Sequence, residues 1–185
     1  MEKPYHHGDL RRALIEAGLK LLEAREADRL SLREVARAVG VSATAVYRHF
    51  PDKDARLDAL ATEGMGRLAA AQHAAADAAG GGEKGFVATG IAYVRFALGN
   101  PALFRLTFGA TASRNILEAP EHMPDALAFL RRNAEQAAAQ TGGDPRVIAV
   151  RAWSIAHGLA TLILEQQVDA DDALIEQVIS QAAKG

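Results

Sequence analysis

Hydroxyl, aromatic and basic side chains gather between residues 31 and 53, and their chemistry suits contact with a polyanion. Ser, Thr and Tyr hydroxyls and Arg, Lys and His nitrogens are the groups that bind phosphate oxygens and the edges of bases. Residues 29–56 contain six Arg or Lys against three Asp or Glu, a local charge of +3, although the whole chain has a net charge of −2. The stretch therefore predicts a nucleic-acid-binding surface whose positive charge is local.

A first short helix must support this surface. Apolar residues recur at helical spacing between residues 32 and 39, so one face of the segment is expected to be buried. Ser31 and Glu34 form the Ser-x-x-Glu pattern of a capping box at the start of this helix. Gly40 follows the last apolar position, where a left-handed backbone can end the helix.

A second short helix is predicted from Ser42, as its cap, to about Phe50. Val46 and Phe50 lie four residues apart and are expected to be buried. In a helix-turn-helix the second helix enters the major groove and its first residues meet the base edges. We therefore expect base contacts from Ser42, Ala43 and Thr44, with the methyl of Ala43 or Thr44 against a thymine methyl.

The order of these residues resembles the DNA-binding region of the TetR family of transcriptional regulators. The similarity lies in Ala-x-x-Val-Gly-Val-Ser, then Tyr-Arg-His-Phe, then an Asp-Lys-Asp helix start. The early Tyr-His-His-Gly-Asp-Leu-Arg, and Trp153 with His157 and Gly158 far downstream, resemble the branch named for a Trp-His-Gly signature in its C-terminal domain. The chain departs from the family in lacking a glycine near residues 26–30.

The resemblance implies roles for further residues of this region. Tyr47, His49 and Lys53 match positions that clamp DNA phosphates in the family. The alternatives are that Tyr47 packs in the core with a solvated hydroxyl and that His49 caps the end of its helix. The complete set of expected DNA contacts is Ser31, Arg33, Ser42, Ala43, Thr44, Tyr47, Arg48, His49 and Lys53.

The rest of the chain is also predicted to be helical, giving an all-α fold of two domains. Alanine is abundant, and the period-two alternation of a strand is absent. We expect a helix-turn-helix domain over residues 1–51 and a regulatory and dimerisation domain over residues 52–185, which begins with a linking helix over 52–79. Further helices are expected over residues 83–99, 102–108, 125–140, about twenty residues from 144, and a last one from Asp171. Residues 111–124 are expected to form a loop or lid, and Gly80–Gly82 a break.

Apolar and aromatic residues of the second domain could surround a ligand. Aromatic residues make up 5% of the chain, yet several lie between residues 86 and 108. They could be plain core, or they could line a pocket for an apolar small molecule. Trp153 and His157 share a helix face and could be a structural pair or part of a pocket wall. The expected ligand-binding set is Phe96, Phe104, Phe108, Leu127, Trp153 and His157.

Other kinds of protein are disfavoured by what the sequence lacks. It has no cysteine, no Ser/His/Asp ordering, no phosphate-binding loop and no metal-ligand spacing. We therefore expect no enzyme, no metal and no cofactor. We find no leader and no apolar run near eighteen residues, so we expect a cytoplasmic protein without a membrane span.

Taken with the resemblance, these observations predict a homodimeric regulator. One reading module buries too little surface to be selective, so two copies are expected to read an inverted-repeat operator in double-stranded DNA. The two C-terminal helices would pair with those of a partner copy, as in the resembled family. A repressor released by a small apolar or amphipathic effector is expected; the alternative is a helical adaptor or an activator without ligand control.

Overall fold

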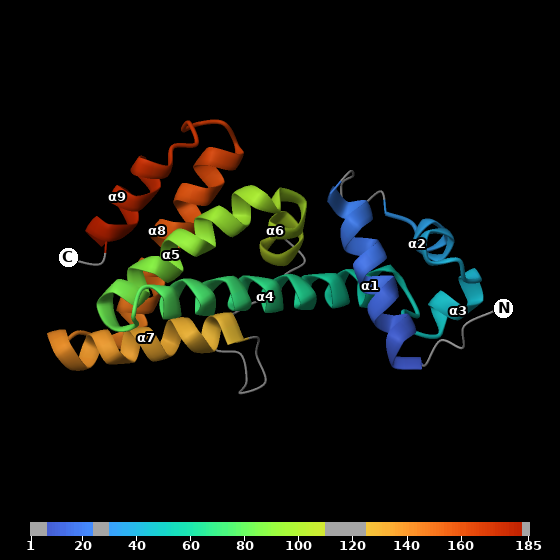
Figure 1. Cartoon of the computed structure of the whole chain (residues 1–185), viewed down its shortest axis with the longest axis horizontal. Helices are drawn as coiled ribbons and strands as arrows, with labels where there is room; N and C mark the ends of the chain where they lie inside the picture. Colours follow the sequence, from blue (N-terminus) through green and yellow to red (C-terminus); the bar gives the residue numbers. More distant parts are fainter. Residues whose placement is uncertain (1–6, 24–29, 110–124, 183–185) are drawn as a thin grey trace. The chain divides into compact units, whose positions relative to one another are not determined.

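The computed structural model describes residues 7–23, 30–109 and 125–182, and every regular element in them is an α-helix (Figure 1). The predicted all-α fold is confirmed, because no strand occurs within these ranges. The chain forms two compact units. The predicted lid at 111–124 and most of the connection at 26–30 lie outside the described residues.

The first unit comprises Met1–Gly64 and Asn100–Ala112. It contains α1 (His7–Glu23), α2 (Leu32–Val39), α3 (Ala43–Tyr47), the first part of α4 (Lys53–Ala78), and α6 (Pro101–Phe108). A Cβ at Gly18 of α1 would lie 3.0 Å from a methyl of Leu60 on α4, so the expected close approach at this glycine is confirmed. The centre of the unit is formed by side chains that are at most 2% exposed: Leu14, Leu22, Val35, Val46, Phe50 and Leu60.

The start and end of α2 agree with the sequence prediction. Ser31 Oγ accepts a hydrogen bond from the Glu34 amide at 3.2 Å, and the Glu34 carboxylate accepts one from the Ser31 amide at 3.1 Å. This reciprocal pair is the capping box. Gly40 ends the helix at φ 77°, and the next amide, of Val41, donates back to the Ala36 carbonyl.

Helix α3 is shorter than expected, because it ends at Tyr47 and not near Phe50. The amide of His49 donates to the Val46 carbonyl at 3.0 Å, a three-residue bond that tightens the chain into a turn. Pro51 then disfavours a helical conformation for Phe50, the residue before it. Asp52 starts α4 by accepting a hydrogen bond from the Ala55 amide at 2.7 Å, as predicted.

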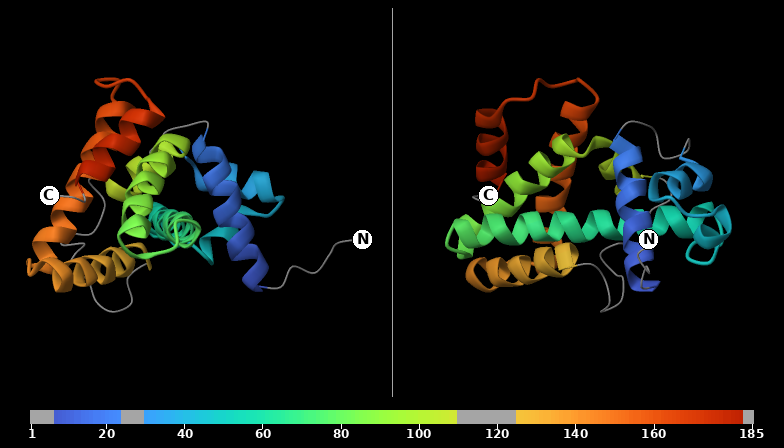
Figure 2. Two further views of the ribbon diagram at one scale, coloured as in Figure 1. Left: turned by 60° about the vertical axis from the view of Figure 1, so that its left-hand side comes forward. Right: turned by 45° about the vertical axis from the view of Figure 1, so that its right-hand side comes forward.

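The second unit comprises Met65–Gly99 and Ser113–Gly185. It contains the rest of α4, α5 (Gly82–Gly99), α7 (Asp125–Thr141), α8 (Pro145–Leu164) and α9 (Asp172–Ala182). Helix α8 packs against α5, α7 and α9, and Figure 2 shows α8 and α9 side by side after a short connection.

Helix α9 is fastened to its neighbours by polar and close apolar contacts. The Arg95 guanidinium of α5 lies 3.0 Å from the Asp172 carboxylate and 3.2 Å from that of Glu176. A Cβ at Gly90 of α5 would lie only 2.7 Å from Ile179 Cγ2, so the two helices meet closely there. Asp171 accepts a hydrogen bond from the Ala173 amide at 2.9 Å, which confirms the predicted cap of the last helix.

Three successive glycines connect α4 to α5. Gly80, Gly81 and Gly82 all have positive φ angles, of 81°, 71° and 59°. The Gly81 amide donates to the Ala76 carbonyl at 3.0 Å, which closes the end of α4. The break predicted at this point is confirmed.

The expectation of no long apolar run is wrong for α8. Within the described residues, this helix is long and apolar enough to cross a membrane by length and composition, and 28% of its most apolar window is buried. Core helices of soluble proteins meet the same criteria. The feature that distinguishes α8 is its apolar outer face, on which Val147 is 61% exposed and Leu162 is 41% exposed.

Candidate nucleic-acid interface and interior polar cluster

The first turn of α3 presents its side chains to solvent. Ser42 caps the helix, and its Oγ accepts a hydrogen bond from the Ala45 amide at 3.2 Å. Thr44 and Arg48 are exposed, Tyr47 is 52% exposed, and Ala43 is partly exposed. The exposed Tyr47 ring argues against the alternative that this residue is core. Val46, which lies between these residues, is fully buried and anchors α3. The exposed side of α3 is therefore suited to a groove of DNA.

The other expected DNA contacts lie at the starts of α2 and α4. Ser31, Arg33 and Lys53 are exposed, and His49 is partly exposed. The Ser31 hydroxyl donates to Glu34 Oε2 at 2.8 Å while it accepts from the Glu34 amide. The capping box thus uses the one proton of this hydroxyl, so Ser31 would donate it to a phosphate oxygen only by releasing the Glu34 carboxylate.

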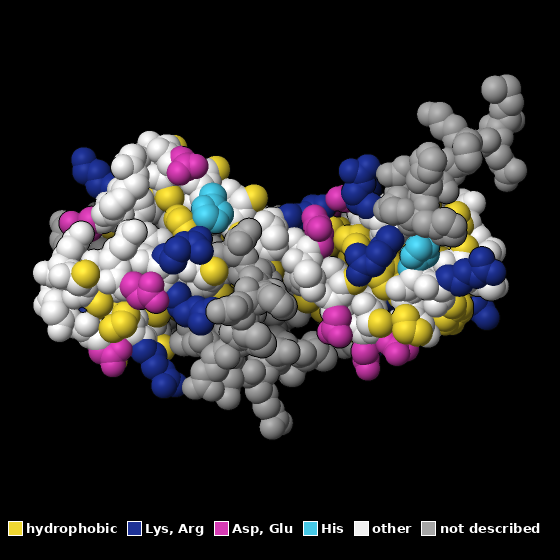
Figure 3. All heavy atoms as spheres, turned by 90° about the horizontal axis from the view of Figure 1, so that it is seen from below, with side chains coloured by type: hydrophobic (Ala, Val, Ile, Leu, Met, Phe, Trp, Pro, Cys, Tyr) yellow, Lys and Arg dark blue, Asp and Glu magenta, His cyan; other side chains and the backbone are white. Residues whose placement is uncertain are grey.

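The basic footprint is smaller than the count from the sequence. Arg56, which is one of the six basic residues of that count, is 3% exposed and cannot meet a phosphate. Arg29 lies outside the described residues, and Arg33, Arg37, Arg48 and Lys53 are exposed. On the face drawn in Figure 3, Lys and Arg side chains stand mostly apart from one another among neutral surface.

Three side chains of the second unit form a hydrogen-bonded chain in its interior. Trp153 Nε1 of α8 lies 3.1 Å from the Tyr93 hydroxyl of α5, and that hydroxyl lies 2.8 Å from His157 Nδ1. An indole nitrogen only donates, so the Tyr93 oxygen accepts from Trp153. The Tyr93 hydroxyl and His157 Nδ1 share the second hydrogen bond, whose direction is set by the tautomer of the imidazole.

Burial acts on both titratable members of this cluster in the same direction, toward the neutral form. Tyr93 is 5% exposed, and desolvation raises the pKa of its hydroxyl well above the ordinary value. Desolvation lowers the pKa of the half-buried His157 imidazole below 6.5. The cluster is therefore a polar site in which burial favours the neutral form of both groups.

The residues expected to bind a ligand are divided between the units. Phe104 and Phe108 belong to α6 of the first unit, with ring centroids 5.1 Å apart. The other four belong to the second unit: Phe96, Leu127, Trp153 and His157. The ligand pocket itself stays a prediction.

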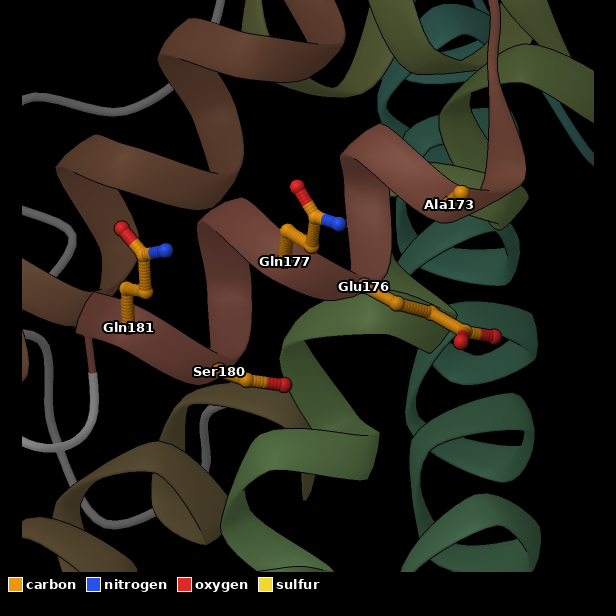
Figure 4. A pocket seen from close by; sticks show the side chains of 5 residues that line it. All are labelled: Ala173, Glu176, Gln177, Ser180 and Gln181. Carbon is orange, nitrogen blue, oxygen red and sulfur yellow. The ribbon is translucent and has the colours of Figure 1, made fainter.

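A surface hollow is lined by one face of α9 alone. Its lining residues are Ala173, Glu176, Gln177, Ser180 and Gln181, which project outward from that helix (Figure 4). None of them was expected to bind a ligand.

Gly158 leaves open space beside α8. A Cβ at this glycine would meet nothing within 4 Å among the described residues.

Sequence reasoning missed the roles of two residues. Tyr93 was assigned to core or pocket, whereas its hydroxyl joins two residues 60 and 64 positions away. Arg56 was counted as surface charge, whereas its guanidinium donates to the Leu30 carbonyl in the core. The periodicity of the long helix was the available signal for Arg56, since it lies beside the apolar Leu57 and one turn before Leu60.

The described residues contain no group of three His, Asp or Glu side chains close enough to hold a metal ion.

Comparison with known proteins gives two consecutive family matches. Residues 14–60 match the family described as bacterial regulatory proteins, tetR family. Residues 86–182 match the tetracyclin repressor-like C-terminal domain. The particular branch with a Trp-His-Gly signature stays a prediction.

Solved structures with the same fold cover nearly the whole chain. A protein of unknown function from Rhodococcus is 35% identical and covers 99% of this chain and 96% of its own, with a TM-score of 0.77. A TetR family transcription regulator from Marinobacter aquaeolei is 21% identical over 95% of this chain and 94% of its own, with a TM-score of 0.68, and is similar in fold.

A curated relative adds support in the reading region. An uncharacterised HTH-type transcriptional regulator from Haemophilus influenzae is 51% identical over 45 residues, which are 24% of this chain and 22% of that protein. The Marinobacter and Haemophilus proteins are both named as transcriptional regulators. The chain therefore belongs to the TetR family of transcriptional regulators, and α2 and α3 form its DNA-binding helix-turn-helix.

Proposed function

We propose that the protein is a cytoplasmic, homodimeric repressor that binds an inverted-repeat operator and is released by a small apolar or amphipathic effector. The observation that supports this most strongly is the capped, outward-facing first turn of α3, with the 52% exposed Tyr47 beside it. A dimer of such modules reads two half-sites about 34 Å apart, or slightly more.

In this proposal, the residues at the start of α3 read the bases. Ser42, Ala43 and Thr44 contact the base edges, with the Thr44 or Ala43 methyl against a thymine methyl. Tyr47, Arg48, His49 and Lys53 bind phosphates on one side, and Ser31 and Arg33 do so at the start of α2. All nine residues are exposed or partly exposed, and they belong to one compact unit.

Base contact at Thr44 can be tested with modified DNA. A duplex is first selected from random sequence by the unsubstituted protein, and each thymine of its half-site is then replaced by uracil, which lacks the C5 methyl. One replacement should weaken binding by the unsubstituted protein and have no effect on Thr44→Ser, which also lacks a methyl. If the losses from DNA and protein add at every thymine, Thr44 does not contact a thymine methyl.

Phosphate contact at Lys53 has a different signature. Lys53→Ala should weaken binding to all sequences alike and reduce the salt slope of the binding constant by about one. Lys84→Ala removes an exposed lysine from α5 of the second unit and serves as the control. If Lys53→Ala and Lys84→Ala behave alike, Lys53 has no role in DNA binding.

The dimer would form through the outer faces of α8 and α9. Exposed Val147 and Val150 and the open Gly158 share one side of α8, and an exposed glycine allows a second helix to approach closely. Arg151 ties α8 to the end of α9 through the Ala182 carbonyl at 2.6 Å, so the two helices present one joint surface. Exposed apolar side chains gathered on one side of a helix favour an interaction there.

Sedimentation equilibrium tests this interface. Gly158→Leu fills the space that a partner helix would need and should shift the protein from dimer to monomer at micromolar concentration. Gly66→Leu is the matched control, because Gly66 also lies in a helix with nothing within 4 Å. A Gly158→Leu protein that remains as dimeric as the control would exclude α8 from the interface.

The effector would bind in the second unit near Trp153 and His157. The support is a group of hydrogen-bonding side chains in the same unit as buried apolar residues such as Leu127, which is 4% exposed. Phe96 also belongs to this unit, whereas Phe104 and Phe108 belong to the first unit and are left out of the proposed site. Release of DNA requires that the effector bind more tightly to the form of the protein that does not fit the operator.

Medium-chain alcohols and fatty acids are suitable first probes, titrated into the preformed protein–DNA complex. Binding is followed by the fluorescence of Trp153, the single tryptophan of the chain, and DNA release by anisotropy. A probe that changes the fluorescence without releasing DNA is not an inducer. The alternative function, an activator or adaptor without ligand control, would be favoured if no bound probe alters DNA affinity.

A further inference from the structure

A charged residue lies in the core of the DNA-reading unit. Arg56 is 3% exposed, and its Nη2 donates a hydrogen bond of 2.6 Å to the carbonyl of Leu30, itself 3% exposed. Its Nε is buried and has no hydrogen-bond partner among the described residues. Burial lowers the pKa of the guanidinium, so the environment disfavours the charge.

Stability alone does not account for an arginine at this position. A buried charge loses its hydration, and the carbonyl acceptor that the described residues supply to Nη2 offsets only part of that loss. Apolar side chains of similar size are often as good or better for stability at such sites. The hydrogen bond supplies something that an apolar contact does not, namely a direction and a fixed pair of atoms.

The two ends of this hydrogen bond lie at the starts of two helices. Leu30 directly precedes Ser31, the cap of α2, and Arg56 lies in the first turn of α4. The contact joins residues 26 positions apart. At its other end α2 is joined to α3 by the Gly40 turn and the bond from Val41 to Ala36.

We propose that Arg56 is a positioning residue that sets the orientation of the α2–α3 pair on α4 and thereby the fit of α3 to DNA. Apolar packing alone permits small rotations and shifts of a helix, whereas a buried hydrogen bond to a backbone carbonyl restricts both. Arg56 itself cannot touch a phosphate, because its guanidinium lies in the core. The inference depends on DNA binding and not on the proposed effector or dimer interface.

The test separates positioning from stability and from phosphate contact. Arg56→Met keeps length and removes the hydrogen bond; Leu57→Met, at the adjacent buried position, introduces the same side chain without touching that bond. For each variant we would measure the thermal midpoint and the affinity for a duplex selected by the unsubstituted protein, over a range of salt concentrations. Amide exchange of Val35, whose amide donates to the Ser31 carbonyl, reports on the first turn of α2.

Arg56→Met is expected to keep or raise the thermal midpoint, to weaken DNA binding about tenfold, and to leave the salt slope unchanged. Exchange at Val35 should become faster. Leu57→Met should lower the midpoint slightly and leave DNA affinity within about twofold. Arg56→Lys, which keeps a donor on a shorter stem, should recover part of the affinity lost in Arg56→Met.

Two results would overturn the inference. A folded Arg56→Met protein with unchanged DNA affinity would show that the residue only fills the core. A salt slope lowered by about one would show that Arg56 contacts a phosphate. If Arg56→Met does not fold, Arg56→Leu, which also lacks a donor, decides by the same criterion: normal affinity in the folded variant refutes the positioning role.

Discussion

Replacing Tyr93 with phenylalanine removes the atom that joins the interior polar cluster and leaves the ring in place. Trp153 Nε1 loses the Tyr93 hydroxyl oxygen that lies 3.1 Å from it, and His157 Nδ1 loses the same hydroxyl, which lies 2.8 Å from it. Each net hydrogen bond contributes about 0.5–1.5 kcal/mol, and Trp153 and His157 are only half-buried, so water can partly replace the hydroxyl. Two bonds therefore give an expected loss of about 1–3 kcal/mol in the free energy of unfolding.

The assay is urea denaturation followed by the fluorescence of Trp153, at one fixed protein concentration because association would shift the midpoint. Tyr47→Phe is the matched control: the same hydroxyl is removed from a residue that is 52% exposed, and its effect should stay within about 0.5 kcal/mol. The reasoning is refuted if Tyr93→Phe and Tyr47→Phe unfold at the same free energy, since the hydroxyl of Tyr93 would then contribute nothing to folding.

Three further predictions concern single positions. Burial holds the pKa of His157 in the folded protein below 6.5, so as the pH falls the unfolded chain takes up a proton at this residue first. The free energy of unfolding therefore decreases as the pH falls from 6.5 to the pKa of the folded protein. Denaturation at pH 7.5 and 5.5 should show a smaller difference for His157→Gln than for the unsubstituted protein. Gly90→Ala places a Cβ 2.7 Å from Ile179 and should lower the free energy of unfolding by about 1–3 kcal/mol. Gly66→Ala, where a Cβ meets nothing within 4 Å, should raise it by about 0.5–1 kcal/mol. Calorimetry of the two variants measures both changes. Gly40→Ala should lower the free energy of unfolding by about 1–2 kcal/mol, because the φ of 77° strains a residue with a side chain while a Cβ there meets nothing within 4 Å. Gly40→Asn should lower it by less. Equal losses in the two variants would show that the backbone angle is not the cause.

Local signals predicted the helix starts and the main turn. The caps at Ser31, Ser42, Asp52 and Asp171 depend on atoms within three residues of one another, so the sequence contains all the information they need. The left-handed Gly40 is of the same kind. The early end of α3 was missed because it depends on a competition between the apolar pair Val46 and Phe50 and the constraint from the following proline.

Contacts between distant residues could not be predicted in this way. No periodicity relates Tyr93 to a tryptophan 60 residues later, and the type of Arg56 predicts a solvated surface position. The exposed side of α8 was also missed, because its apolar residues point around the helix and only packing decides which of them remain outside. The sequence predicts which candidate DNA contacts belong to the same helix-turn-helix. It does not predict that Arg56 is buried and adds nothing to the positive charge of the DNA-binding surface.

The three left-handed glycines between α4 and α5 have a practical consequence for protein engineering. Gly80, Gly81 and Gly82 meet nothing within 4 Å where a Cβ would stand, so replacing any of them is limited by backbone strain and not by crowding. Lengthening the connection avoids that strain, because added residues need not adopt the same angles. This junction is thus a suitable insertion point for a fluorescent protein domain, which would turn the regulator into a genetically encoded reporter of its own conformational state.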